Sequence, residues 1–322
     1  MTEHKRVALA LGSGGARGYA HIGVIQVLEE HGYEVVAVSG TSMGALVGGL
    51  YAAGQLEEYD EWVTGLAARD VWRLLDVSVR GAGIIRGDKV MARVADLLAG
   101  AAIEDLRIPY TAVATDLAAR KEVWFQHGPV EVAIRASTAL PTFLTPVMHQ
   151  GRLLADGGLM NPVPIAPLTA VPADLVVAVT LDGDDGSHTG GAPEHESAEE
   201  PSDEEWRARL RLVAAQVRGT ETAQRVAGWL RNARAGGGLP EPDETGSLYD
   251  DLPPGLGFID VMEMSLETLQ SVVARYRMAS YPPDLLISIP RHACRTLEFH
   301  RAHELISLGR EIAERTLKDA GP

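Results

Sequence analysis

A serine between two glycines is the first feature of this sequence that could carry out chemistry. Residues 40–44 read Gly-Thr-Ser-Met-Gly, a GxSxG pattern with Ser42 at its centre. A serine on a sharp turn between a strand and a helix projects its hydroxyl group, and flanking Gly40 and Gly44 allow the backbone to fold tightly. Such a hydroxyl group can attack the carbonyl carbon of an ester. In a glycine-rich chain the pattern acquires meaning only if a strand and a helix surround it.

A glycine-rich segment lies closer to the N-terminus, where residues 12–18 read Gly-Ser-Gly-Gly-Ala-Arg-Gly. It places several unhindered backbone N–H groups at the start of an expected helix, whose dipole favours negative charge. The GxGxxG spacing of dinucleotide loops is absent because Arg17 stands three residues after Gly14, and a phosphate loop ending in Gly-Lys-Ser/Thr is also absent. The segment instead suits an oxyanion hole for the tetrahedral intermediate of ester cleavage. Its candidate donors are the amides of Gly14, Gly15 and Ala16.

A third segment, Asp156-Gly157-Gly158, follows an expected strand at residues 152–155. An Asp-Gly pair usually marks only a turn. A serine nucleophile needs a base, however, and the usual base is a histidine that follows an acid in the chain. The later histidines are His188, His195, His292, His300 and His303. None of them lies in a motif, so we interpret each as a solvated histidine.

Two consecutive strand–turn–helix units are expected to position the serine and the glycine-rich loop. An apolar run at residues 6–11 leads into the loop, and residues 19–30 continue with apolar residues at helical spacing. The unit repeats with a strand at 35–39, a turn at 40–44 and a helix at 45–53. Two adjacent units of this kind predict a parallel sheet covered by helices.

Further elements are predicted along the rest of the chain. Strands are expected at 110–116, 122–126, 152–155, 175–181 and 285–289, and helices at 130–137, 258–277 and 303–317. Residues 35–56 contain no charged residue and are long enough to span a bilayer. Their five glycines and several polar residues favour a buried strand and helix instead.

The composition excludes some classes of function. A net charge of −15 argues against a general nucleic-acid-binding protein, which needs clustered lysine and arginine. The single cysteine, Cys294, rules out an internal disulfide and is typical of a reducing compartment. Residues 1–5 are polar and lead directly into the first strand without a signal-like segment. We therefore expect a cytoplasmic location, which leaves room for peripheral contact with a membrane.

The three glycine-containing segments, in this order, resemble the patatin-like phospholipase family, whose signature is GxGGxRG, then GxSxG, then a DGG or DGA turn. The resemblance covers about Val7 to Leu181 and includes residues 133–141 and 161–164, which flank the aspartate turn. Residues 258–317 are similar to the C-terminal part of the bacterial members and of the neuropathy-target-esterase branch. The resemblance implies an α/β fold of three layers, with a central, mostly parallel sheet and helices on both faces.

Carried over to this sequence, the resemblance makes Ser42 the nucleophile and Asp156 the general base of a Ser–Asp dyad, with the oxyanion hole around Gly14 and Gly15. It implies no metal ion and no cofactor. The supporting motif residues are Gly12, Arg17, Gly18, Gly40, Gly44, Gly157 and Gly158. Arg17 can anchor an acidic side chain or face a lipid phosphate, and we favour the anchoring role because an arginine buried under a loop is normally paired. Asn161 is expected to pin the aspartate turn.

The chain departs from the family in a long insert. We expect residues 1–183 to form the catalytic core, 184–257 an acidic, low-complexity insert, and 258–322 a strand and helices that complete the same domain. Within the insert, residues 206–235 predict a basic amphipathic helix. Such a helix can lie on an anionic membrane or form a lid over the site, although the simpler interpretation is a helix packed on the domain.

These observations predict a serine hydrolase that acts on the acyl esters of phospholipids or lysophospholipids, with a lipid as its partner and no nucleic acid. One alternative is a soluble carboxylesterase or thioesterase, because the fold and the dyad do not determine the acyl substrate. A second alternative is a non-catalytic regulatory protein of the same fold, and a third is a nucleotide-binding module. The sequence leaves the head group, the acyl length and the oligomeric state open.

Overall fold

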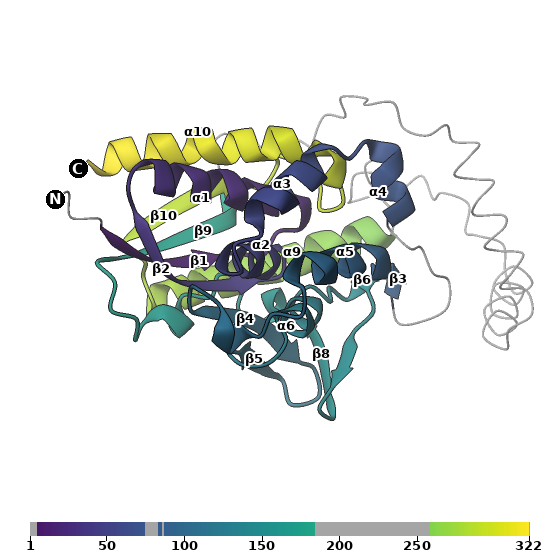
Figure 1. The fold of residues 1–322 in the computed structure, drawn as a ribbon. Helices are drawn as coiled ribbons and strands as arrows, with labels where there is room; N and C mark the ends of the chain where they lie inside the picture. Colours follow the sequence, from purple (N-terminus) through teal and green to yellow (C-terminus); the bar gives the residue numbers. More distant parts are fainter. Residues whose placement is uncertain (1–4, 75–82, 86, 184–257, 322) are drawn as a thin grey trace, which may run out of the picture. The chain divides into compact units, whose positions relative to one another are not determined.

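The computed structural model describes residues 5–74, 83–85, 87–183 and 258–321 (Figure 1). By their contacts, the described residues up to 183 and from 262 onward belong to one compact unit. The predicted insert at 184–257, with its basic helix and its suggested lid or membrane role, lies outside the described residues.

The described strands of the main sheet are β1 (Arg6–Leu11), β2 (Glu34–Thr41), β4 (Tyr110–Asp116), β5 (Lys121–Phe125), β7 (Val147–His149), β8 (Arg152–Asp156), β9 (Leu175–Gly183) and β10 (Leu285–Pro290). The described helices are α1 (Ala20–Glu30), α2 (Met43–Ala52), α3 (Leu56–Thr64), α4 (Ala68–Leu74), α5 (Asp88–Leu98), α6 (Val130–Ser137), α9 (Phe258–Ser280) and α10 (Ala302–Ala320). Short 3₁₀ turns include η1 (Gly15–Tyr19) and η3 (Gly157–Leu159). A separate pair of strands, β3 (Gly83–Ile85) and β6 (Thr142–Leu144), runs parallel.

The main sheet is parallel over most of its width. Its order in the described part of the chain is β10-β9-β1-β2-β4-β8-β7, with β5 also paired to β4. The strands from β10 to β4 run parallel, whereas β5, β8 and β7 add antiparallel pairs at one end. Parallel neighbours need a crossover between them, and α1 and α2 follow β1 and β2 in this way.

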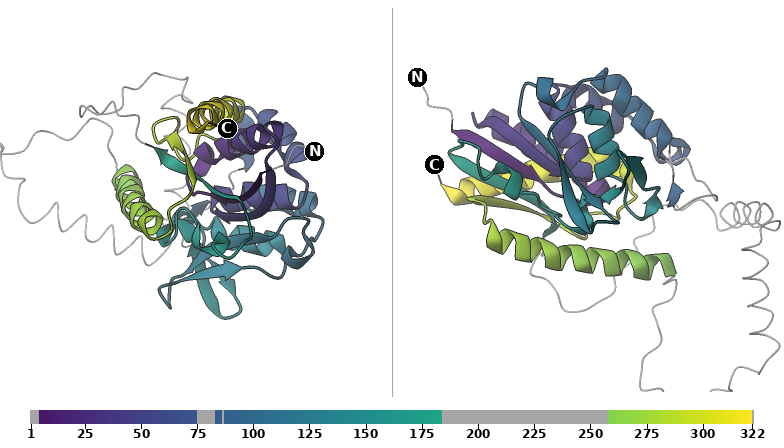
Figure 2. Two further views of the ribbon diagram at one scale, coloured as in Figure 1. Left: turned by 90° about the vertical axis from the view of Figure 1, so that its left-hand side faces the viewer. Right: turned by 90° about the horizontal axis from the view of Figure 1, so that it is seen from below.

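Alternation along β1 shows how the sheet separates two layers of helices. Val7, Leu9 and Leu11 face a core shared with α1, α2 and α10. Ala8 and Ala10 point to the other face, where they belong to a smaller cluster with a residue of α9. Since successive side chains of a strand point to opposite faces, large residues fill one side and alanines allow close packing on the other. Figure 2 shows α9 across the sheet from α1 and α10.

The predicted three-layer α/β fold with a mostly parallel central sheet is confirmed. Every strand and helix predicted within the described residues is present, with bounds that differ by a few residues. Residues 35–56 form β2 and α2, as predicted. In the described part of the chain, no helix is both long and apolar enough to cross a membrane.

Candidate active site

Ser42 lies in the sharp turn between β2 and α2. Its backbone has a φ of 58° and a ψ of −123°. This conformation is strained for a non-glycine residue, and such strain is typical of functional sites. The two flanking glycines allow this turn because neither position has room for a side chain. A Cβ atom at Gly40 would overlap the carbonyl group of Gly44, and one at Gly44 would overlap the carbonyl group of Leu11.

The register of the sheet brings Asp156 to Ser42. The last residue of β2, Thr41, pairs with Val113 of β4, and the last residue of β8, Asp156, pairs with the next residue, Ala114. Strand β2 runs parallel to β4 and β8 runs antiparallel to it, so β2 and β8 approach each other from opposite ends of β4. Their carboxyl ends therefore meet at neighbouring residues of β4. As a result, the Ser42 hydroxyl group donates a hydrogen bond of 2.5 Å to Oδ2 of Asp156.

The surroundings of Asp156 change its acidity. The residue is fully buried, and burial raises the pKa of its carboxyl group to about 6. Two hydrogen bonds to the carboxylate partly offset that increase in pKa. The Ser42 hydroxyl group donates to Oδ2, and the Gly158 N–H group donates to Oδ1 at 2.7 Å. A carboxylate with this pKa is ionised at neutral pH and is a stronger base than an exposed aspartate.

Ser137 holds the backbone of the nucleophile. Its hydroxyl oxygen accepts a hydrogen bond of 2.9 Å from the Ser42 N–H group, and the hydroxyl group donates to the Val113 carbonyl at 2.6 Å. The side chain is fully buried at the end of α6. Sequence reasoning placed Ser137 in a stretch typical of the family and gave it no role. Only its contact with β4 and the serine turn reveals one.

The glycine-rich loop follows β1 and passes beside Ser42. The N–H group of Gly12 donates to Val179, that of Ser13 to Pro162, and that of Ala16 to Thr296, at 2.8–2.9 Å. This engagement corrects one expectation, because Ala16 is not free to serve as a third oxyanion donor. The N–H groups of Gly14 and Gly15 remain. Gly18 lies in η1, and Gly157 and Gly158 begin η3 directly after Asp156.

Arg17 ties this loop to its surroundings. Its guanidinium group donates to the Gly14 carbonyl at 3.3 Å, to the Arg291 carbonyl at 2.5 Å and to the carboxylate of Glu267 on α9 at 2.6 Å. The side chain is 10% exposed. These bonds are of the anchoring kind expected from the sequence, since a buried guanidinium group needs partners for its donors.

Further hydrogen bonds hold the residues that follow the aspartate turn. The Thr41 hydroxyl group donates to the Asn161 carbonyl at 2.8 Å, and the Asn161 amide donates to Glu122 at 2.9 Å. Arg277 of α9 forms an ion pair with Glu122 at 2.9 Å and donates to the Met160 carbonyl at 3.2 Å. Two elements distant in sequence, β5 and α9, thereby fix the segment that follows Asp156.

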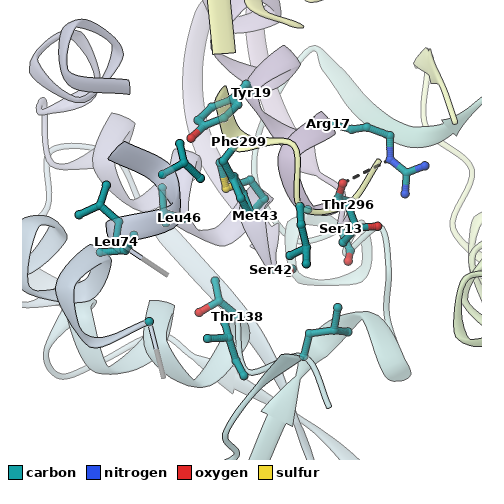
Figure 3. A pocket seen from close by; sticks show the side chains of 18 of the residues that line it. Ser13, Arg17, Tyr19, Ser42, Met43, Leu46, Leu74, Thr138, Thr296 and Phe299 are labelled. Atoms are coloured by element: carbon teal, nitrogen blue, oxygen red, sulfur yellow. Dashed lines mark hydrogen bonds between the residues drawn. The ribbon is translucent and has the colours of Figure 1, made fainter. Parts of the chain in front are cut away.

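A cavity of about 160 Å³ opens beside Ser42, and most of the side chains that line it are apolar. In Figure 3, Tyr19, Met43, Leu46, Leu74 and Phe299 lie on one side of Ser42, and Ser13, Arg17 and Thr296 lie on the other. Ser42 therefore lies between an apolar part and a polar part of the cavity lining.

Histidines are absent from this cavity wall in the described part of the chain. His21 is fully buried nearby, bonded through Nε2 to the Gly12 carbonyl at 2.8 Å, and burial lowers its pKa to about 4. That histidine is neutral at pH 7. His188 and His195 lie outside the described residues. Among those described, no group of three or more metal-ligating side chains could hold a metal ion.

Comparison with known proteins identifies the family. Residues 9–169 match the family model described as patatin-like phospholipase. The chain belongs to the patatin-like phospholipase family. A protein of Mycobacterium tuberculosis named an uncharacterized NTE family protein is 44% identical, over 97% of this chain and 91% of the relative.

Two further patatin-like relatives are much longer proteins. Lysophospholipase nte1 of Emericella nidulans is 33% identical over 55% of this chain, and the mouse patatin-like phospholipase domain-containing protein 6 is 33% identical over 56%. The matches span 12% and 14% of those relatives. The crystal structure of VipD from Legionella pneumophila is similar in fold, with a TM-score of 0.50 and 16% identity over 99% of this chain and 67% of VipD.

The predicted resemblance to patatin-like phospholipases and to the NTE branch is thus confirmed, and so is the expectation of an enzyme of the lipid-esterase class.

Proposed function

We propose that this patatin-like enzyme hydrolyses the acyl esters of phospholipids or lysophospholipids, with Ser42 as nucleophile and Asp156 as general base. The observation that carries the proposal is the 2.5 Å hydrogen bond from the Ser42 hydroxyl group to a fully buried carboxylate. A nucleophile and a base within hydrogen-bonding reach are the minimum requirement for this chemistry.

The proposed reaction proceeds in two stages. Asp156 removes the hydroxyl proton as the Ser42 oxygen attacks the ester carbonyl carbon, and the N–H groups of Gly14 and Gly15 bind the oxyanion that forms. The intermediate collapses, the leaving alcohol takes the proton from Asp156, and the acyl group remains on Ser42. Water then gives a proton to Asp156 and attacks the acyl carbon, which releases a fatty acid and returns the proton to Ser42.

The cavity supports a substrate with an acyl chain. Its lining includes Leu46, Tyr59, Trp62 and Phe299, which offer an apolar surface directly beside the nucleophile. Burying methylene groups there is favourable by about 0.8 kcal/mol for each one. The alternative of a soluble carboxylesterase or thioesterase requires only the same dyad. Preference for micellar over monomeric substrate at equal concentration supports the lipid substrate, and equal rates support the alternative.

The dyad is tested by labelling with a fluorophosphonate probe, which reacts with an activated serine. Wild type should be labelled, and Ser42→Ala should not. Asp156→Asn should be folded but should hydrolyse a short-chain ester and a lysophospholipid at least a hundredfold more slowly, the typical contribution of a general base. Ser307→Ala is a matched control, because its hydroxyl group lies exposed on α10.

Labelling that persists in Ser42→Ala contradicts the proposed nucleophile. A wild type that neither reacts with the probe nor hydrolyses either ester favours the regulatory alternative. Cytoplasmic location and peripheral membrane contact remain predictions. Flotation of the protein with lipid vesicles tests membrane contact, and light scattering determines the oligomeric state.

A further inference from the structure

Three polar atoms from distant segments surround one side of Gly158. A Cβ atom built on Gly158 would lie 2.7 Å from Oγ of Ser13, 2.8 Å from Nε2 of Gln270 and 3.0 Å from Oδ1 of Asp156. Ser13 belongs to the glycine-rich loop, Gln270 to α9 and Asp156 to the end of β8. The fold therefore gathers a hydroxyl group, an amide donor and the proposed base around Gly158, at a point that a side-chain carbon cannot occupy.

The amide nitrogen of Gln270, Nε2, is buried and has no hydrogen-bond partner in the described part of the structure. A buried donor without an acceptor costs about 1–3 kcal/mol. Gln270 and Ser13 both line the cavity that contains Ser42, so a small molecule in that cavity can supply the acceptor.

The chemical nature of these groups suits a water molecule. The amide donates a hydrogen bond, the carboxylate oxygen accepts one, and the hydroxyl group of Ser13 can do either. Water is the second substrate of ester hydrolysis, and it must reach the acyl group on Ser42 from a position where Asp156 can take its proton. A buried water typically forms about three hydrogen bonds, and Ser13, Gln270 and Asp156 are three groups able to form them.

We propose that Gln270, with Ser13, positions the water that releases the acyl group from Ser42. In this step an O–H bond of the water breaks and the proton passes to the Asp156 carboxylate. The water oxygen bonds to the acyl carbon, the carbon–Oγ bond of Ser42 then breaks, and the proton returns from Asp156 to the Ser42 oxygen. Gln270 is a positioning residue here, and the inference rests on the proposed Ser–Asp dyad.

The decisive variant is Gln270→Met, which removes the amide donor and keeps the length of the side chain. Acylation is followed by the rate of fluorophosphonate labelling. Deacylation is followed by mass spectrometry, as the decay of acyl-enzyme after rapid removal of a p-nitrophenyl ester. We expect deacylation to be about five- to tenfold slower, the effect of one lost hydrogen bond, and acylation to change less than twofold. Ser13→Ala should slow the same step.

Two controls separate positioning from a general structural effect. Leu269→Met changes the adjacent position of α9, where the side chain is 64% exposed, and should leave both rates unchanged. Hydroxylamine is a strong nucleophile that needs no positioned water, so it should cleave the acyl-enzymes of wild type and Gln270→Met at equal rates.

Unchanged deacylation in Gln270→Met overturns the inference, and so does an equal decrease in acylation and deacylation, which indicates a structural role. Failure of the dyad itself gives a different result, because the wild type then forms no acyl-enzyme or Ser42→Ala still forms one.

Discussion

A carboxyl group kept away from water determines the residue-scale chemistry of this site. Asp156 is fully buried, and burial raises its pKa from the ordinary value of 3.8 to about 6. Water favours the charged form of an acid, so removing water makes the carboxylate a better proton acceptor. In the proposed mechanism this burial favours catalysis, and it also reduces the stability of the folded protein wherever the group is ionised.

The pH dependence of activity follows from this pKa. Only ionised Asp156 can accept the proton of Ser42, so kcat/KM for a short-chain ester should rise with pH through a midpoint near 6 and then level off. A stopped assay from pH 4 to pH 8 measures the profile. A midpoint near 4 would indicate that Asp156 is not shielded from water, and a flat profile would exclude it as the base.

The same shift predicts that Asp156→Asn stabilises the folded state. Because the folded pKa is the higher one, the native protein binds more protons than the unfolded chain between about pH 4 and 6. Its stability therefore falls as pH rises through this window, by on the order of 3 kcal/mol above pH 6. The Asp156→Asn variant has no ionisable group at this position. Its free energy of unfolding in urea should therefore exceed that of wild type at pH 8 and differ little from it at pH 3.5. An equal difference at both values would contradict the linkage.

At the scale of elements, β4 acts as a template for the site. It carries β2 along its first residues and β8 along its last, so the ends of both strands stop at neighbouring positions. Helix α2 then begins directly after Ser42, and its second residue, Gly44, packs against the end of β1. The conformation of the serine turn therefore depends on contact between a helix and a strand that are not adjacent in the chain.

Gly44→Ala tests this dependence. Its added methyl group would overlap the Leu11 carbonyl, a backbone atom that cannot move without disturbing β1. We expect a loss of several kcal/mol, in the range of overpacked cores, and loss of fluorophosphonate labelling. Gly65→Ala is the matched control, because its Cβ atom would lie 3.4 Å from the nearest atom and its φ is −79°. Thermal unfolding of both variants measures the effect, and equal melting temperatures would refute the argument.

At the scale of the whole molecule, the two ends of the chain share one core. Helix α10 packs along α1, and Leu305 and Ile312 belong to the same apolar cluster as Ile22 and Leu28 (Figure 1). The two backbones come into close contact, since a Cβ atom at Gly309 would overlap the Ala20 carbonyl. We propose on this basis that residues 258–322 complete the catalytic domain begun by residues 1–183.

Truncation before Ala302 tests the proposal. Removing α10 exposes the apolar face of α1 and takes several fully buried side chains out of the core, at about 1.5–3 kcal/mol for each large one. The sum is comparable with the whole stability of an ordinary domain, so the truncated chain should show no cooperative unfolding by circular dichroism. A chain that ends at Ala320 is the control and should unfold like wild type. Cooperative unfolding of the shorter chain would show that α10 is dispensable.

Local patterns in the sequence were sufficient to predict the three motifs and most strands of the main sheet, but they predicted no element at α3, α4, α5, β3, β6 or β7. The GxSxG turn, the glycine-rich loop and the Asp-Gly-Gly turn each consist of consecutive residues, and the alternation of β1 and the spacing in α1 repeat within a few positions. These features can be recognised from residue types and spacing over a few positions, because turns and periodicity depend on neighbours in the chain. The family and its fold followed from the order of these motifs.

Which atoms come into contact depends on the three-dimensional packing of segments that are distant in the chain. The hydrogen bond from the Ala16 amide to Thr296, the support of Ser42 by Ser137 and the placement of Gln270 beside Gly158 all join segments far apart in sequence. These contacts depend on the register of β8 and β2 on β4 and on where α9 crosses the sheet. Such long-range packing has no local signal, because many pairings bury similar apolar area and the whole chain selects one of them.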